Sequence, residues 1–149
     1  MNLQDVVHIA ITLEKKGADF YLSLKEKAPA PEVRDMFHRL AEDEKMHARQ
    51  FEELLGKKPD LKDNQAAADF MEYLKAVNGH DFLTGPFTDK PPANFKDALA
   101  IGIEAEKDSI LLYHELYQAL PPGEAQDAVS RLLQEEKLHL VELRNYQEE

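Results

Sequence analysis

Two copies of the motif Glu-x-x-His stand out, because carboxylates and imidazoles are the side chains that bind divalent metal ions. The first copy begins at Glu44 and the second at Glu136, and each follows a further glutamate by 30 residues. Residues three apart lie on one face of a helix, so each motif presents both ligand types on the same side. The six candidate metal ligands are Glu14, Glu44, His47, Glu106, Glu136 and His139.

The four glutamates stand in the middle of apolar helical faces. Around Glu44, for example, the positions three, four and seven residues away hold Phe37, Leu40, Ala41, His47, Ala48 and Phe51. No lysine or arginine occupies the corresponding positions around any of the four glutamates. An unpaired buried charge costs several kcal/mol, and clustered carboxylates repel one another or take up protons. Bound metal cations are the economical way to compensate these charges.

The number and type of ligands predict two metal ions per chain. Two divalent cations balance four carboxylates, and six protein ligands leave open positions for small molecules. A lone glutamate from each of two helices, with Glu-x-x-His from each of the other two, is the arrangement of di-iron and di-manganese carboxylate bundles. Mixed oxygen and nitrogen ligands favour iron or manganese, with zinc as an alternative. We therefore expect two metal ions of this kind, through which the six residues would act catalytically.

Proline positions mark the helices that must hold these residues, because proline inside a helix costs about 3 kcal/mol. All eight prolines fall in three regions, which leaves four long segments without proline. The predicted helices span about 3–28, 32–56, 95–120 and 123–146. The short turns within each pair predict two antiparallel hairpins. A single domain over 1–149 is expected, with one hairpin at 3–56, a crossover at 57–94 containing a short helix near 64–78, and a second hairpin at 95–146.

The two hairpins are copies of each other. A shift of 92 residues aligns them without a gap and, from Val6 onward, pairs identical residues at 14 positions, among them Glu14 with Glu106 and His47 with His139. Repeated units of this kind usually cannot bury their apolar faces alone. The repeat therefore predicts two hairpins that close face to face around the glutamates.

Composition excludes several classes of function. The chain has 149 residues and no cysteine, which excludes disulfides, Cys-ligated zinc, iron–sulfur clusters and thiol nucleophiles. Its net charge of −11 gives no electrostatic basis for binding nucleic acid or an anionic membrane. The chain lacks the basic start of a secretory signal and any run of about 20 apolar residues. We expect a cytoplasmic protein.

The two hairpins resemble the rubrerythrin branch of the ferritin-like superfamily. The segments that carry the resemblance are LEKKGADFY, AEDEKMH, AEKDSILLY and QEEKLH. The resemblance implies an all-α, ferritin-like four-helix bundle in which the six candidates are the diiron ligands. It places Glu44 and Glu136 at bridging positions and Glu14 and Glu106 at terminal ones. Tyr21 and Tyr113 match family tyrosines that lie beside the ligands, where a buried phenol would find a carboxylate partner.

The sequence departs from the rubrerythrin pattern in two respects. Ser109 stands where the family has a further glutamate, which puts efficient peroxidase cycling in doubt. The chain also lacks the cysteines of a rubredoxin domain, so electrons would come from an external donor, such as a rubredoxin-like protein or a small molecule.

Three functions follow from these observations. In the first, the chain is an oxidoreductase that reduces hydrogen peroxide, or oxidises Fe(II) with dioxygen. In the second, it binds or stores iron without peroxidase turnover. In the third, it is a structural relic that holds zinc or protonated glutamates. A homodimer or higher homo-oligomer is expected in each case.

The remaining polar residues near the motifs are expected to be ordinary surface groups. The histidines without a repeated partner are His8, His38, His80 and His114. Glu42, Glu104 and Glu135 lie close to ligands in sequence but about 100° or more away around the helix, which predicts a solvated face.

Overall fold

A computed structural model of the protein contains four long helices in its described part. The described residues are 3–56 and 92–147, together with the single positions 69, 72, 73, 76 and 87. The helices are α1 (Leu3–Lys27), α2 (Pro31–Gly56), α4 (Phe95–Ala119) and α5 (Glu124–Gln147). Each begins and ends within about one residue of its predicted boundary, which confirms the all-α class. Most of the predicted short crossover helix near 64–78 lies outside the described residues.

Local sequence signals account for the ends of the helices. Pro31 begins α2, where the missing N–H of proline costs nothing. The Asn94 side chain caps α4 by accepting a 2.8 Å hydrogen bond from the backbone N–H of Asp97. Gly123 precedes α5 with a φ of +151°, which L side chains rarely adopt. These signals define where α2 and α4 begin and allow the tight turn before α5.

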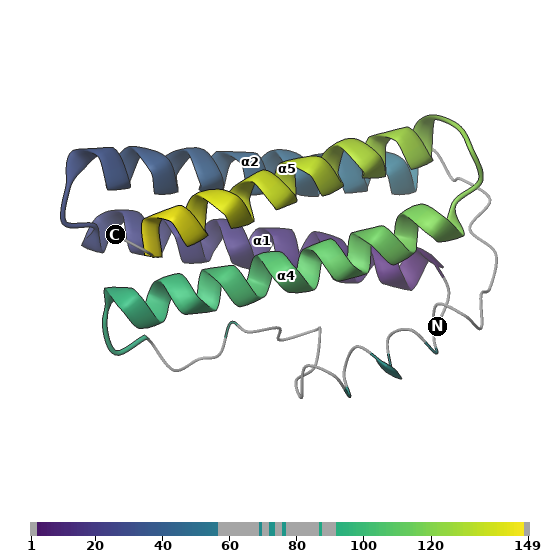
Figure 1. The fold of residues 1–149 in the computed structure, drawn as a ribbon. Coiled ribbons are helices and arrows are strands. Elements are labelled where there is room, and N and C mark those ends of the chain that lie inside the picture. Colours follow the sequence, from purple (N-terminus) through teal and green to yellow (C-terminus); the bar gives the residue numbers. More distant parts are fainter. Residues whose placement is uncertain are drawn as a thin grey trace.

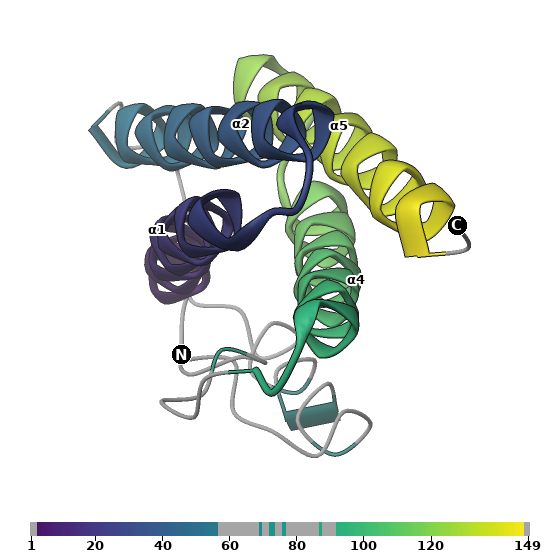
Figure 2. The ribbon, with the colours of Figure 1, turned by 90° about the vertical axis from the view of Figure 1, so that its left-hand side faces the viewer.

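The four helices form a bundle of two hairpins (Figure 1). Helix α1 packs antiparallel to α2, and α4 packs antiparallel to α5. The hairpins meet where α1 contacts α4 and α2 contacts α5, as the view along the bundle shows (Figure 2). Helix α2 ends at one end of the bundle and α4 begins at the other, so the connection between them must cover the length of the bundle. This is the connectivity of ferritin-like folds.

Two apolar clusters fill the interior of the bundle. One gathers residues from the first part of α1, the last part of α2, the last part of α4 and the first part of α5, including Val7, Phe51, Leu112 and Leu133. The other gathers the opposite parts of the same helices, including Leu24, Phe37, Leu40, Leu99 and Leu143. Full burial of each such side chain contributes about 1.5–3 kcal/mol. On every helix the predicted ligands fall between the stretches that form these two clusters.

None of the helices in the described part of the chain is long and apolar enough to cross a membrane. Most of their apolar residues face the bundle interior, and their outer faces carry most of the charge.

Candidate metal centre

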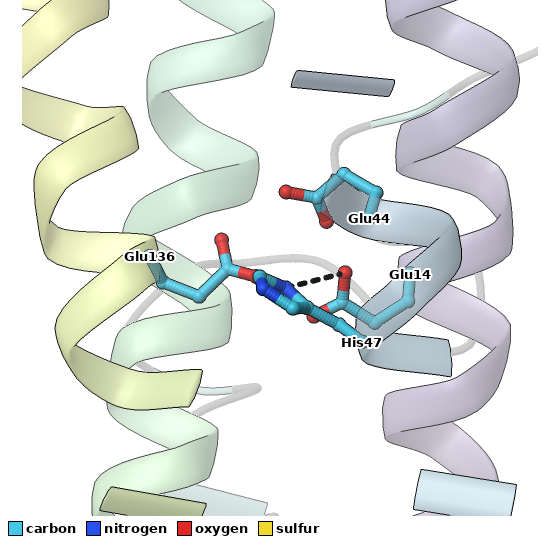
Figure 3. Close-up of side chains that lie close together, drawn as sticks. All are labelled: Glu14, Glu44, His47 and Glu136. Atoms are coloured by element: carbon cyan, nitrogen blue, oxygen red, sulfur yellow. Dashed lines mark hydrogen bonds and ion pairs between the residues drawn. The ribbon is translucent and has the colours of Figure 1, made fainter. Parts of the chain in front are cut away.

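All six predicted ligands meet in a buried layer at the middle of the bundle. Helices α1 and α4 each contribute one glutamate, and α2 and α5 each contribute one Glu-x-x-His motif. Each of the six residues is at most 4% exposed. Figure 3 shows four of them directed toward one another from α1, α2 and α5. The six are Glu14, Glu44, His47, Glu106, Glu136 and His139.

The candidate ligand atoms form two overlapping groups, and each group is compact enough to hold a metal ion. One group joins Glu14, Glu44, His47 and Glu136, and its candidate ligand atoms all lie within 4.8 Å of one another. The other group meets the same limit with Glu44, Glu106, Glu136 and His139. Glu44 and Glu136 belong to both groups, while the other four residues belong to one each. This arrangement suits two metal ions that share two carboxylates.

The two histidines direct the same ring atom into the centre. His47 places Nδ1 2.7 Å from Glu136 Oε1 and 3.5 Å from Glu14 Oε2. His139 places Nδ1 3.0 Å from Glu44 Oε1 and 3.5 Å from Glu106 Oε1. The rings stack with their centroids 5.9 Å apart. Nδ1 is therefore the nitrogen that each histidine would offer to a metal.

The other ring nitrogen of each histidine reaches a carboxylate on the opposite hairpin. His47 Nε2 hydrogen-bonds to Glu135 of α5, and His139 Nε2 lies 3.0 Å from Asp43 Oδ2 of α2. Glu135 lies on a solvated face, as predicted, but its contact with His47 was not predicted. Its side chain is half exposed, but its inner oxygen orients a buried imidazole. Such a partner keeps the proton on Nε2 and frees Nδ1 for a metal.

Neither Asp43 nor Glu135 was predicted as a site residue. Each lies one position before the glutamate of a Glu-x-x-His motif, and the two are 92 residues apart, as the repeat requires. A repeated carboxylate beside a repeated ligand was thus the signal that could have found them. Their partners on the opposite hairpin become visible only when the two hairpins are packed.

We expect Asp43→Ala and Glu135→Ala each to weaken Fe(II) binding by roughly 10- to 100-fold, the usual cost of removing a group that orients a metal-binding histidine. Anaerobic Fe(II) titration against a chelator of known affinity measures the change. Glu42→Ala is the matched control, because Glu42 is exposed and pairs with Lys45 at 3.2 Å. Wild-type affinity in both variants would show that the histidines need no outer partner.

The predicted tyrosines also bond across the hairpins. Tyr21 of α1 donates a 2.6 Å hydrogen bond to Glu106 Oε1 of α4, and Tyr113 of α4 donates to Glu14 Oε1 of α1. Both phenols are buried. Burial, followed for Tyr21 by the charge of Glu106, raises the pKa of both hydroxyls well above the ordinary value, so they remain protonated donors. Each hydroxyl therefore holds one oxygen of a ligand glutamate and leaves the other oxygen free.

The buried glutamates of the centre differ in the direction of their pKa shifts. Burial, followed by the charges of Glu136 and Glu14, raises the pKa of Glu44 well above its ordinary value. Burial also raises the pKa of Glu106 to about 8, with the Glu136 charge adding to the shift. For Glu14, burial acts in the same direction, but hydrogen bonds with Glu44 and His47 outweigh it and lower the pKa.

The histidines are held as cations in the metal-free centre. Burial alone would lower the pKa of His47, but hydrogen bonds to Glu136 and Glu14 raise it to about 12. The same balance, with Glu106 and Glu136 as partners, raises the pKa of His139 to about 11. Protons on Nδ1 thus supply part of the positive charge that the glutamates require. These protons must leave when a metal binds.

Among the described residues, three buried carboxylate oxygens have no hydrogen-bond partner: Glu14 Oε2, Glu106 Oε2 and Glu136 Oε2. A buried polar atom without a partner costs about 1–3 kcal/mol. All three belong to the two groups of metal-site geometry. The donor set of carboxylate oxygens and imidazole nitrogens, with these free oxygens among them, fits two divalent cations of the iron or manganese type.

The other candidates lie away from the centre. His8, His38 and His114 are exposed, as predicted, and His80 lies outside the described residues. Glu104 is exposed and pairs with Lys107 at 3.2 Å, which agrees with a solvated face. Ser109 is 8% exposed and lies one helical turn after Glu106.

Comparison with known proteins agrees with this geometry. The family model described as rubrerythrin matches residues 5–146. Among solved structures, a Thermotoga maritima protein described as ferritin-like and diiron-carboxylate is 28% identical, with a TM-score of 0.72. The alignment covers 100% of this chain and 96% of that one. No curated protein sequence matches.

Proposed function

The chain belongs to the rubrerythrin family, and from this premise we propose that it is a diiron oxidoreductase that reduces hydrogen peroxide, or oxidises Fe(II) with dioxygen, using an external electron donor. The observation that carries the proposal is the pair of overlapping ligand groups that share Glu44 and Glu136. The family and the buried carboxylate–histidine cluster together indicate iron binding.

The residues of this chain would hold and orient the metals. Glu44 and Glu136 would bridge the two ions, and Glu14 with His47, and Glu106 with His139, would complete one site each. When bound, a pair of Fe(II) ions supplies the two electrons that reduction of one hydrogen peroxide to two waters consumes.

The surroundings of the ligands control geometry and water. Glu135 and Asp43 fix the two imidazoles, and the tyrosine hydroxyls fix the two terminal glutamates. Phe37 and Phe51, both 0% exposed, belong to the apolar clusters on either side of the ligand layer. These clusters exclude bulk water, which strengthens every charge interaction inside.

The partners and setting of the protein follow as further parts of the proposal. The chain has no cysteine with which to hold a rubredoxin-type centre, so a separate rubredoxin-like protein or a small reductant would deliver the electrons. The acidic chain gives no basis for a nucleic-acid or membrane partner. We propose a cytoplasmic homodimer or higher homo-oligomer.

Metal loading tests the proposed function directly. We expect two irons per chain by elemental analysis after anaerobic Fe(II) loading, and a visible oxo-bridge absorption after addition of oxidant. A faster response to peroxide than to air would support peroxidase chemistry, and a faster response to air would support Fe(II) oxidation. Iron content near zero, or zinc that iron cannot displace, would eliminate both reactions.

Iron storage is the second candidate function, because it could use the same centre. Storage requires a closed shell of many subunits that encloses a mineral. Light scattering separates the two, since a dimer-sized particle excludes a shell and a particle of many subunits favours one.

A further inference from the structure

A small cavity lies against the metal centre between α1 and α4. Its volume is about 10 Å³, close to the space that one water molecule needs. Gly17, Ala105 and Ser109 form part of its lining. Glu44 and Glu106 contribute carboxylates to its wall. The cavity therefore lies between helices of the two different hairpins, at the level of the ligands.

Small residues at equivalent positions of the two hairpins keep this space open. Gly17 and Ser109 are 92 residues apart and thus correspond in the repeat, each three residues after a terminal glutamate. A Cβ atom at Gly17 would lie 3.4 Å from Glu44 Oε2. Any side chain at position 17 would therefore extend toward the bridging carboxylate, and a larger one at position 109 would extend into the same cavity.

One carboxylate oxygen of the cavity lining has no hydrogen-bond partner in the described part of the chain. Glu106 is 2% exposed and lines the cavity; its Oε1 accepts from Tyr21, and its Oε2 has no such donor. The ring of Phe87, which also lines the cavity, lies 5.1 Å from that of Phe20 and adds an apolar wall. A cavity of this size with one polar side suits a ligand of one or two heavy atoms that is small and oxygen-like.

We propose that this cavity is the place where a small oxygen species, such as water, dioxygen or hydrogen peroxide, meets the metal centre, and that Gly17 and Ser109 are the residues that set its size limit. The inference rests on the proposed diiron function and adds to it a place of entry and a limit on substrate size. It makes Gly17 and Ser109 specificity-determining residues, although neither is a metal ligand.

Nitric oxide is a suitable probe, because it has two heavy atoms, binds ferrous iron and does not require turnover. The full chain is loaded anaerobically with Fe(II), and the rate of nitric oxide binding is followed by stopped-flow absorption. We expect Gly17→Ala and Ser109→Val to slow binding roughly tenfold or more, since the added atoms overfill the site, with iron content unchanged. Gly56→Ala is the matched control, because its added Cβ meets none of the described residues within 4 Å, and it should bind at the wild-type rate.

Each outcome bears on one proposal. Wild-type rates in Gly17→Ala and Ser109→Val, with two irons per chain, would overturn the inference and leave the diiron function intact. Loss of iron from Gly17→Ala would also overturn it, because the space would then serve metal binding and not ligand entry. Failure of the wild-type chain to bind iron would overturn the proposed function itself. In that case, a crystal structure of the zinc-loaded protein still tests the cavity, since an ordered water beside Glu106 supports a small-ligand site and a dry cavity contradicts it.

Discussion

We expect Glu44→Ala or Glu136→Ala to lower the iron content from the proposed two per chain to one or fewer. Both residues belong to both ligand groups, so removing either carboxylate takes a ligand from each metal at once. The remaining charge no longer balances two divalent cations, and the second ion becomes the more weakly held. Glu14→Ala, which affects one group only, should retain more metal than either bridging variant. Elemental analysis after Fe(II) loading and gel filtration measures the difference.

The control for these variants must remove a carboxylate that is not part of the metal centre. Glu42→Ala lies on the same helix as Glu44, removes an exposed carboxylate and should retain two irons. Circular dichroism checks that each variant remains helical. Two irons per chain in folded Glu44→Ala protein would show that Glu44 does not bridge.

The metal-free protein should lose stability as the pH rises from 5 to 8, and the stabilisation by metal should grow over the same range. The pKa of Glu106 is about 8 in the folded chain, raised from an ordinary value of 4.5 mainly by burial. The folded state therefore keeps a proton that the unfolded chain releases above about pH 4.5. This contribution to stability is lost as the pH rises through the interval from 4.5 to 8.

Most of the other titrating ligands also make the metal-free protein less stable as the pH rises. Burial and neighbouring charge raise the pKa of Glu44, so its contribution also falls with rising pH. Hydrogen bonds to glutamates outweigh burial and raise the pKa of His47 and His139 to about 12 and 11, so their contributions decline above pH 6.5. Glu14 acts oppositely, but below pH 4.5, because its pKa is lowered. The net slope from pH 5 to 8 is therefore negative.

Metal binding reverses the trend, because ligands must lose their protons to bind. Two sites saturated at 100 times their Kd contribute about 5 kcal/mol, which raises the Tm of a chain of this size by roughly 10–20 °C. Thermal melts with and without metal at several pH values measure both effects. Glu44→Gln removes one titrating group and should flatten the metal-free curve. A metal-free Tm that is constant from pH 5 to 8 would contradict the prediction.

The ligands could be predicted from sequence because their signal is local and repeated. The three-residue spacing of Glu44 and His47 indicates that they share one face of a helix. The second copy, at Glu136 and His139, has the same spacing at the equivalent position of the repeat. Apolar neighbours then show that the face is buried. Helix boundaries were equally accessible, since Pro31 and Asn94 carry their own start signals.

Contacts between the hairpins could not be predicted, because helical periodicity describes one helix at a time. Glu135 has a half-exposed side chain, so its pattern is that of an ordinary surface residue, although it bonds to His47. Tyr21 lies two turns from Glu14 on the same helix, yet it donates to Glu106 of the other hairpin. Only the packing of the two hairpins determines these partners.

The exchange of partners across the hairpins has a consequence for the origin of the fold. Each hairpin holds its own glutamates and histidine, but the groups that orient them come from the other hairpin. Tyr113 hydrogen-bonds to Glu14, and Asp43 hydrogen-bonds to His139. One hairpin alone has a complete set of residue types but lacks these tyrosine and carboxylate partners from the other hairpin. Two identical hairpins related by a twofold axis would satisfy every one of these contacts. The duplicated chain is thus equivalent to a symmetric dimer fused into one polypeptide, whose two halves carry the same ligands but differ at Gly17 and Ser109.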